Sequence, residues 1–171
     1  MGFGDVACIL LANGAEKDAL DDDGESPVLY AANKSHFDVV EMLVRQGVRL
    51  DVRNSTGRSL LHLLSMSGQV GLVELLLNKG VDIEEACLSG RTPLVFAAYH
   101  GQAGVTELLL KRGANRNVTL RGRTPFTHAI IKGRRKVVQA FVENGENVSG
   151  DSRRHGKDGW KRIHSSNVLC L

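Results

Sequence analysis

The sequence predicts an all-α solenoid in which short helical hairpins stack side by side, and two recurring residue types indicate it. Serine or threonine suited to a helix N-cap recurs at Ser26, Ser59, Thr92 and Thr124. Glycine suited to a helix end recurs at Gly14, Gly47, Gly80, Gly113 and Gly145. The intervals are 32 or 33 residues, which suits a repeat of two helices and a turn. Helices this short are not stable alone, so neighbouring units must bury one another's apolar faces.

The unit at residues 90–117 shows the expected first helix most clearly. Thr92 takes the N-cap position, and Pro93 follows at the first helical position, where its missing N–H costs nothing. Ala97 and Ala98 belong to the apolar stripe of this helix, and they are small enough for a neighbouring helix to approach closely. The first helix is therefore expected to pack against its copies in the adjacent units.

A second helix of the same unit is expected to begin near Gln102. Val105, Leu108 and Leu109 share one of its faces at helical spacing. Gly113 follows and suits the left-handed conformation in which many helices end. The two helices together are predicted to form one short antiparallel hairpin.

Two earlier units depart from this pattern. In the unit at residues 25–50, Ser35 stands where glycine is usual, and a left-handed serine there would cost roughly 1 kcal/mol. In the unit at residues 58–83, Leu64 and Ser65 replace the alanine pair. Leu64 must then be accommodated by repacking, at a cost of about 1–3 kcal/mol if its neighbours do not adjust.

Both ends of the chain depart further. Residues 1–14 match only the second helix of a unit, so we expect a fragment, a truncated product or a module of a longer protein, with this half unit as its weakest structured element. The unit at residues 123–148 follows a hairpin that is one residue short, and Ala140 and Phe141 replace its leucine pair. Residues 150–171 are polar, basic and glycine-rich, contain a degenerate start of a further unit, and are expected to be poorly ordered.

The period of 33, the Thr-Pro start of the first helix and the terminating glycines resemble the ankyrin repeat over residues 5–149. The resemblance implies an ankyrin-repeat array at residues 1–149, followed by the basic tail at residues 150–171. It also implies a role for His62, which matches the histidine of the family's T-P-L-H start. That histidine ties neighbouring hairpins together through hydrogen bonds.

The net charge of +3 hides a strong polarity along the chain. Residues 1–90 hold 7 basic and 14 acidic side chains, residues 91–148 hold 10 and 3, and residues 149–171 hold 5 and 2, so the sums are −7, +7 and +3. No apolar run is long enough for a membrane span. Three scattered cysteines favour a reducing compartment, so a cytoplasmic location is expected. The nucleus is the alternative, because the basic run at residues 132–136 has the composition of a weak import signal.

Catalytic, cofactor and metal sites are not expected. His62, His100 and His128 all fall within first helices, and none is paired in the sequence pattern with a nucleophile or a carboxylate. The acidic run before Glu25 does not fit a calcium loop, because Ala19 and Tyr30 would occupy the first and twelfth ligand places. The sequence therefore predicts a protein that is not an enzyme.

The resemblance implies that partners contact the hairpin tips and the exposed ends of the first helices, which line a concave face. Carried over residue by residue, the predicted partner-binding residues are Asp22, Asp23, Glu25, Arg53, Arg58, Met66, Leu88, Arg91, Tyr99, His100, Arg121, Arg123 and Lys132. This face would run from acidic to aromatic to basic. Tyr99 is expected to stand on it between Met66 and Ile131 as the central anchor.

A non-catalytic protein–protein interaction module, monomeric or part of a larger protein, is the leading functional hypothesis. The first alternative is binding of a polyanion, either nucleic acid or an acidic membrane surface, by the basic half of the chain. Few aromatic residues in that half are available to stack on bases, which weighs against nucleic acid. The second alternative is a truncated remnant of a longer array.

Overall fold

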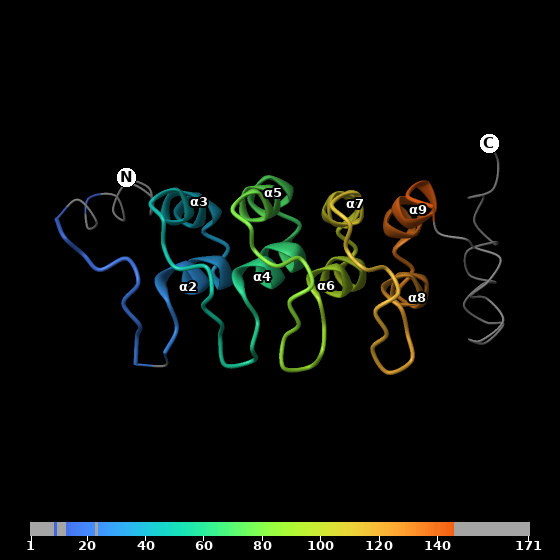
Figure 1. The fold of residues 1–171 in the computed structure, drawn as a ribbon, viewed down its shortest axis with the longest axis horizontal. Coiled ribbons are helices and arrows are strands. Elements are labelled where there is room, and N and C mark those ends of the chain that lie inside the picture. Colours follow the sequence, from blue (N-terminus) through green and yellow to red (C-terminus); the bar gives the residue numbers. More distant parts are fainter. Residues whose placement is uncertain (1–8, 10–12, 23, 146–171) are drawn as a thin grey trace.

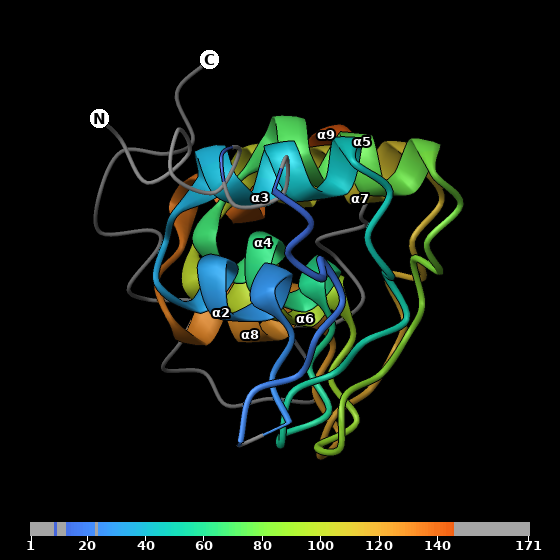
Figure 2. The same ribbon diagram turned by 90° about the vertical axis from the view of Figure 1, so that its left-hand side faces the viewer.

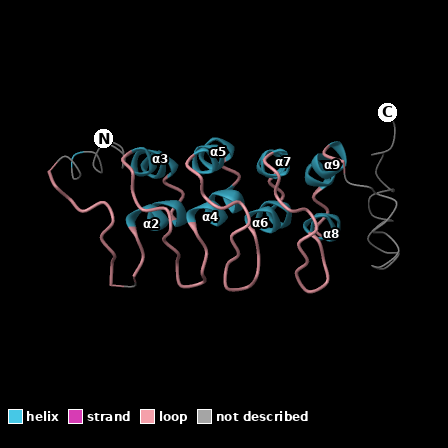
Figure 3. Cartoon of the chain, in the orientation of Figure 1, coloured by secondary structure: helices cyan, strands magenta, loops and turns pink. Residues whose placement is uncertain are grey.

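The computed structural model describes residue 9 and residues 13–22 and 24–145. In this part of the chain it contains four helical hairpins and no strand, only isolated bridges in two loops (Figures 1 and 3). Their helices are α2 (Pro27–Asn33), α3 (Phe37–Arg45), α4 (Leu60–Ser67), α5 (Val70–Asn78), α6 (Pro93–His100), α7 (Ala103–Lys111), α8 (Pro125–Ile131) and α9 (Arg135–Glu143). The predicted all-α solenoid is confirmed. The expectations for the N-terminal half unit and the basic tail fall on residues that lie almost wholly outside the described range.

The helices form two layers (Figure 2). The first helices, α2, α4, α6 and α8, make the inner layer, and the second helices, α3, α5, α7 and α9, make the outer layer. The long loops between hairpins all project to the same side of the stack (Figure 1). We call the surface formed by the inner layer and these loops, at residues 46–59, 79–92 and 112–124, the concave face. No helix within the described ranges is both long and apolar enough to cross a membrane.

Each inner-layer helix begins at the predicted residue, but the capping bonds differ. Ser26, Ser59, Thr92 and Thr124 all have extended backbone before the helix. Thr124 caps α8 directly, because its Oγ1 accepts from the N–H of Thr127 at 3.2 Å. The hydroxyls of Ser26 and Thr92 are buried and have no hydrogen-bond partner among the described residues. At these two positions the extended backbone begins the helix without the expected side-chain bond.

Left-handed residues end the inner-layer helices, as the sequence predicted. Gly68 and Gly101 have φ angles of 78° and 87° at the ends of α4 and α6. Ser35 takes the same place after α2 with a φ of 62°. A side chain with a Cβ is strained in this conformation, so the predicted cost at Ser35 has its structural basis.

The core lies between the layers and between neighbouring inner helices. Ala97 and Ala98 are fully buried, as the close approach of α4 and α8 to α6 requires. Leu64 is also fully buried, so the second unit accommodates the larger side chain. In the last hairpin, Phe141 takes the central buried position and meets Phe126 edge to face at 5.6 Å. The aromatic ring therefore fills the space that a leucine fills in the third unit.

The short fourth hairpin has a different turn from the others. In the loop at residues 54–58, three residues separate the bonded ends, and Gly57 has a φ of 72°. In the loop at residues 120–123, the end residues bond in both directions and only two residues separate them. Both of these, Arg121 and Gly122, have positive φ, at 51° and 72°. Positive φ at both central residues is the type I′ geometry, which closes a hairpin with one residue fewer.

Candidate protein-binding face

A row of alternating cations and aromatic rings crosses the concave face. Arg58 lies 5.0 Å from the ring centroid of Phe96, and Arg91 lies 5.8 Å from the same centroid. Arg91 also lies 5.7 Å from the centroid of Tyr99, and the Lys132 Nζ lies 4.7 Å from it on the other side of the repeat boundary. These five residues, which we call the cation–ring row, come from three successive repeats. The row therefore joins surfaces that are about one repeat apart in sequence.

Two histidines border the tyrosine of this row. The ring of His100 is 5.3 Å from Tyr99, and the ring of His128 is 6.2 Å from it, both edge to face. His100 also stacks on Phe96 at 6.4 Å. Sequence reasoning placed Tyr99 between Met66 and another apolar side chain, but its ring contacts in the structure are with histidines and cations. Tyr99 is half-buried at the end of α6 and lies outside the fully buried core.

Positive charge shifts the titration of the groups around the row. The pKa of Tyr99 is lowered, first because its hydroxyl lies beside Lys132 and also because of the nearby arginines. Burial lowers the pKa of His100, and Arg134 lowers it further. Burial and then Arg123 do the same for His128. Lowered pKa values of both a phenol and imidazoles indicate a positive local potential at this end of the face.

The cations of the row have no carboxylate partner in the described part of the chain. Ion pairs there link Arg45 to Glu41, Arg49 to Asp51, Arg53 to Glu85, Lys111 to Glu107 and Arg112 to Glu74, with His62 also near Glu85. None of them includes Arg58, Arg91, Arg123 or Lys132. The face therefore presents unpaired cations where a partner could reach them.

Arg53, a predicted partner-binding residue, is occupied within the array. Its guanidinium donates to the carboxylate of Glu85 at 3.2 Å and to the carbonyls of Gly57 and Ala86 at 3.1 and 3.3 Å. These bonds connect the second loop to the third. Arg53 therefore holds neighbouring loops together and has few donors left for a partner.

His62 makes the link between hairpins that the sequence predicted. Its Nε2 donates to the carbonyl of Arg91 at 3.0 Å, and its Nδ1 accepts from the N–H of Ser59 at 3.2 Å. The Ser59 hydroxyl donates to the Glu85 carboxylate. Burial is the main reason that the pKa of His62 falls to about 4, and burial also raises the pKa of Glu85. The imidazole is thus neutral and carries its proton on Nε2.

Serine, histidine and glutamate side chains in contact have the composition of a hydrolytic triad, but these three lack its geometry. In a triad the histidine uses one nitrogen to activate the serine and the other to bind the carboxylate. Here the second nitrogen of His62 is used by the carbonyl of Arg91, and the carboxylate of Glu85 binds the Ser59 hydroxyl itself. Ser59 is also buried. The cluster therefore stabilises the stack rather than presenting a nucleophile.

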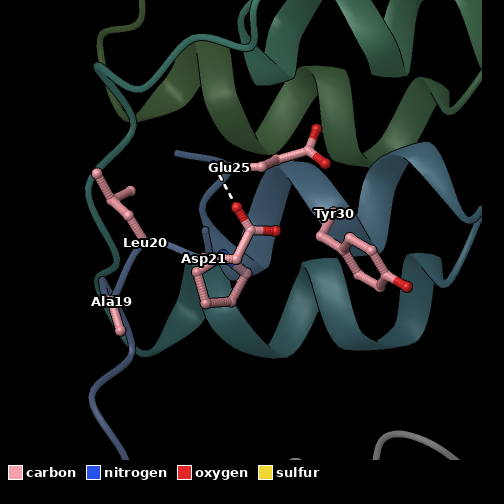
Figure 4. Close-up of a pocket in the computed structure, with 6 residues that line it drawn as sticks. Ala19, Leu20, Asp21, Glu25 and Tyr30 are labelled. Atoms are coloured by element: carbon pink, nitrogen blue, oxygen red, sulfur yellow. Dashed lines mark hydrogen bonds between the residues drawn. The ribbon is translucent and has the colours of Figure 1, made fainter. Parts of the chain in front are cut away.

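The predicted acidic residues lie at the other end of the face, next to a groove of about 370 Å³ (Figure 4). The groove is lined by Ala19, Leu20, Asp21, Glu25, Pro27 and Tyr30. Glu25 is partly engaged, since its N–H donates to the Asp21 carboxylate at 2.7 Å and its own carboxylate accepts from Asn33. Asp22 is exposed, and Asp23 lies outside the described residues. The acidic and basic ends of the face are therefore separate sites.

The other predicted residues have varied surroundings. Leu88 is 81% exposed at the tip of the third loop, and Met66 is half-buried. Arg121 and Arg123 are exposed in the tight fourth turn. They are not joined to Leu88 or Met66 by any contact that would make one pocket. Together they extend the face along the loop tips.

Sequence reasoning missed three residues that shape the site. Phe96 and His128 hold the row together from below, and Arg134 donates from its Nε to the carbonyl of Tyr99 at 3.2 Å. A signal was available, because Phe96 precedes Tyr99 by three residues on the same helix and His128 follows Phe96 by 32 residues, one repeat later. The bond from Arg134 crosses between repeats and depends on the conformation of a long side chain, which spacing alone does not give.

Stacked helical hairpins with all loops on one side define a helical-repeat solenoid, a class whose members use an extended face for binding. The family model for ankyrin repeats, in three copies, matches residues 2–87 and 83–151. The chain therefore belongs to the ankyrin-repeat family, whose domains are generally protein-binding. Comparison with curated proteins gave no match.

Proposed function

We propose that the chain is a non-catalytic module that binds a partner protein through the concave face, with Tyr99 as the central contact. The observation that supports this proposal is the fixed position of Tyr99, whose half-exposed ring is bordered by Arg91, Lys132 and two histidines. A large ring that is already held in place loses little conformational freedom on binding. Tyrosine and arginine are also enriched among the residues that contribute most to protein interfaces.

Polyanion binding by the basic half is a second candidate, and the unpaired cations of the cation–ring row favour it. Such binding would follow the number of phosphates neutralised and would weaken steeply with salt. The rings of the row weigh against a single-stranded nucleic acid, because base stacking needs an open ring face. Phe96 is buried, and the ring of Tyr99 is contacted by Arg91 and Lys132.

Selection of binders from a displayed library of protein fragments on the full chain tests the proposal. Tyr99→Ala should weaken the selected binders by about thirtyfold, which corresponds to about 2 kcal/mol at an interface hot spot. The free energy of unfolding should change by less than roughly 0.5 kcal/mol, because Tyr99 lies outside the core. Binding and thermal unfolding should be measured on the same preparations.

Tyr30→Ala is the matched control, since the chain has two tyrosines and Tyr30 is also an exposed residue of an inner-layer helix. Its affinity for the same binders should stay within a few-fold of the unchanged chain. If binders lose affinity with Tyr30→Ala but not with Tyr99→Ala, the central contact has been assigned to the wrong repeat. If they respond only to changes in the outer helices, the concave face is not the binding surface.

A further inference from the structure

We infer that the basic end of the concave face recognises a short acidic segment of a partner protein, whose carboxylates bind the cations of the cation–ring row. The inference rests on the proposed function and specifies the chemistry of the partner. It begins from the contrast between the cations of this chain. In the described residues Arg45, Arg49, Lys111 and Arg112 pair with carboxylates of the array, whereas Arg58, Arg91 and Lys132 contact only aromatic rings.

The ring contacts hold these cations in place without using their hydrogen bonds. A guanidinium stacked on a ring is covered on one face, while its N–H donors lie in its plane and remain available. Arg58 and Arg91 are both held this way at Phe96, at 5.0 and 5.8 Å from the centroid. A planar, positioned guanidinium binds a carboxylate with two parallel hydrogen bonds. The row is therefore preorganised for carboxylates rather than neutralised by the array.

The potential around the row is positive on every side that the described residues provide. The groups that face Tyr99 and its two histidines are Arg58, Arg91, Arg123, Lys132 and Arg134. No acidic residue appears among the charges that shift the pKa values of these three groups. Binding an external carboxylate here would lower the repulsion between like charges that the fold maintains.

The length of the acidic segment follows from the charge polarity of the array. Residues 1–90 carry a net charge of −7, and exposed Asp22 with half-buried Glu25 lies at the far end of the same face. A long polyanion that followed the whole face would meet these carboxylates and be repelled. A short acidic segment can occupy the third and fourth repeats alone. This argument, with the covered ring faces, favours a peptide over a nucleic acid.

Fluorescence anisotropy with the full chain tests the inference. The probes are a short fluorescein-labelled peptide of alternating glutamate and glycine, the same peptide with glutamine in place of glutamate, and an oligothymidylate of equal length. Titrations would be run between about 50 and 200 mM salt. We expect the glutamate peptide to bind more tightly than both other probes.

Paired variants locate the binding. Arg91→Gln with Lys132→Gln should weaken the glutamate peptide by about tenfold, the effect expected for two partly exposed ion pairs. Lys79→Gln with Lys136→Gln removes the same charge from exposed positions on the outer-layer hairpin ends and should change affinity by less than about twofold. Lys132→Gln alone, at an exposed side chain, repeats the test if the double variant lowers the melting temperature.

Three results would overturn the inference. They are equal weakening by the two double variants, no preference for glutamate over glutamine, and tighter binding of the oligothymidylate. Failure here is distinct from failure of the proposed function. If selected binders still need Tyr99 but carry no acidic segment, the concave face remains the binding surface and only the acidic partner is wrong. If the outer-layer variants weaken both the peptide and the selected binders, both proposals fall.

Discussion

His62 is fully buried between the second and third repeats, and its neutral form is the one that fits the stack. Its pKa is about 4 in the fold, against an ordinary value of about 6.5. Burial is the largest cause, and the positive charges of Arg53 and Arg58 add to it. Protonation would also place a second proton on Nδ1, which accepts from Ser59. The residue therefore links the stability of one repeat junction to pH.

We predict that this link makes the array less stable in mild acid. Below about pH 6.5 the unfolded chain takes up a proton at His62 that the folded chain does not bind, until the pH reaches about 4. The free energy of unfolding should fall by roughly 3 kcal/mol across this window because of His62. Urea unfolding at a series of pH values measures it.

His62→Gln should flatten the dependence between about pH 5 and 6.5, even if the variant is less stable overall. His100→Gln with His128→Gln is the control, because both histidines are less buried and should account for a smaller part of the slope. An unchanged slope in His62→Gln would show that the loss comes from other groups.

At the scale of one helix end, Ser35 is the residue whose type disagrees with its backbone. It has a φ of 62°, while the equivalent residues Gly68, Gly101 and Gly133 have φ between 66° and 87°. Ser35→Gly should therefore stabilise the first repeat by roughly 0.5–1 kcal/mol. Thermal unfolding of the full chain measures the change.

Ser67→Gly provides the opposite case with the same change of residue. Ser67 is the last residue of α4, has ordinary helical backbone, and donates from its hydroxyl to the carbonyl of Leu63 at 2.9 Å. Glycine there should destabilise the chain by roughly 0.5–1 kcal/mol. Stabilisation by both glycines, or by neither, would mean that backbone strain does not decide the effect at Ser35.

The helices were predictable because each one depends on local signals that repeat. The positions of Thr92, Pro93 and Gly101 fix α6, and the same spacing fixes its copies. The link through His62 was predictable from the resemblance. The turn at Arg121 was visible only as a missing residue, because the sequence does not say which turn type restores the pairing.

The binding face was harder to predict because it depends on long side chains from different repeats. Sequence spacing placed Arg53 and Arg91 at equivalent loop positions, yet Arg53 is bonded to Glu85 and Arg91 lies over two rings. The difference arises from which carboxylate lies one repeat away. Glu85 is present for Arg53, whereas Asn117 or Val118 stands about one repeat later. Pairings of this kind need the three-dimensional arrangement.

At the scale of the whole molecule, contacts are limited to neighbouring repeats, and they are unequal. The most extensive inter-helix packing is between α4 and α6, and the packing of α6 with α8 and of α7 with α9 is also extensive. Gln102 adds a bond to the carbonyl of Met66 at 2.9 Å, and Arg112 bonds to Glu74 and Asn78 at 2.7 and 2.9 Å. By contrast, the outer helices α3 and α5 make only sparse contact. The junction between the first and second repeats is therefore the weakest one described.

We predict that the array opens in steps rather than as one unit, because stability in a linear repeat array is a sum of units and nearest-neighbour interfaces. Native-state hydrogen exchange of the full chain should give the lowest opening free energies in α2 and α3 and the highest in α4 and α6. Ser35→Gly should raise protection in α2 and α3 while leaving α8 and α9 nearly unchanged, since distant repeats do not share contacts. Ser67→Gly should instead lower protection in α4 and in the helices packed on it. If all the helices exchanged with one common free energy, and both substitutions shifted every helix equally, the array would unfold as a single cooperative unit and the nearest-neighbour account would be wrong.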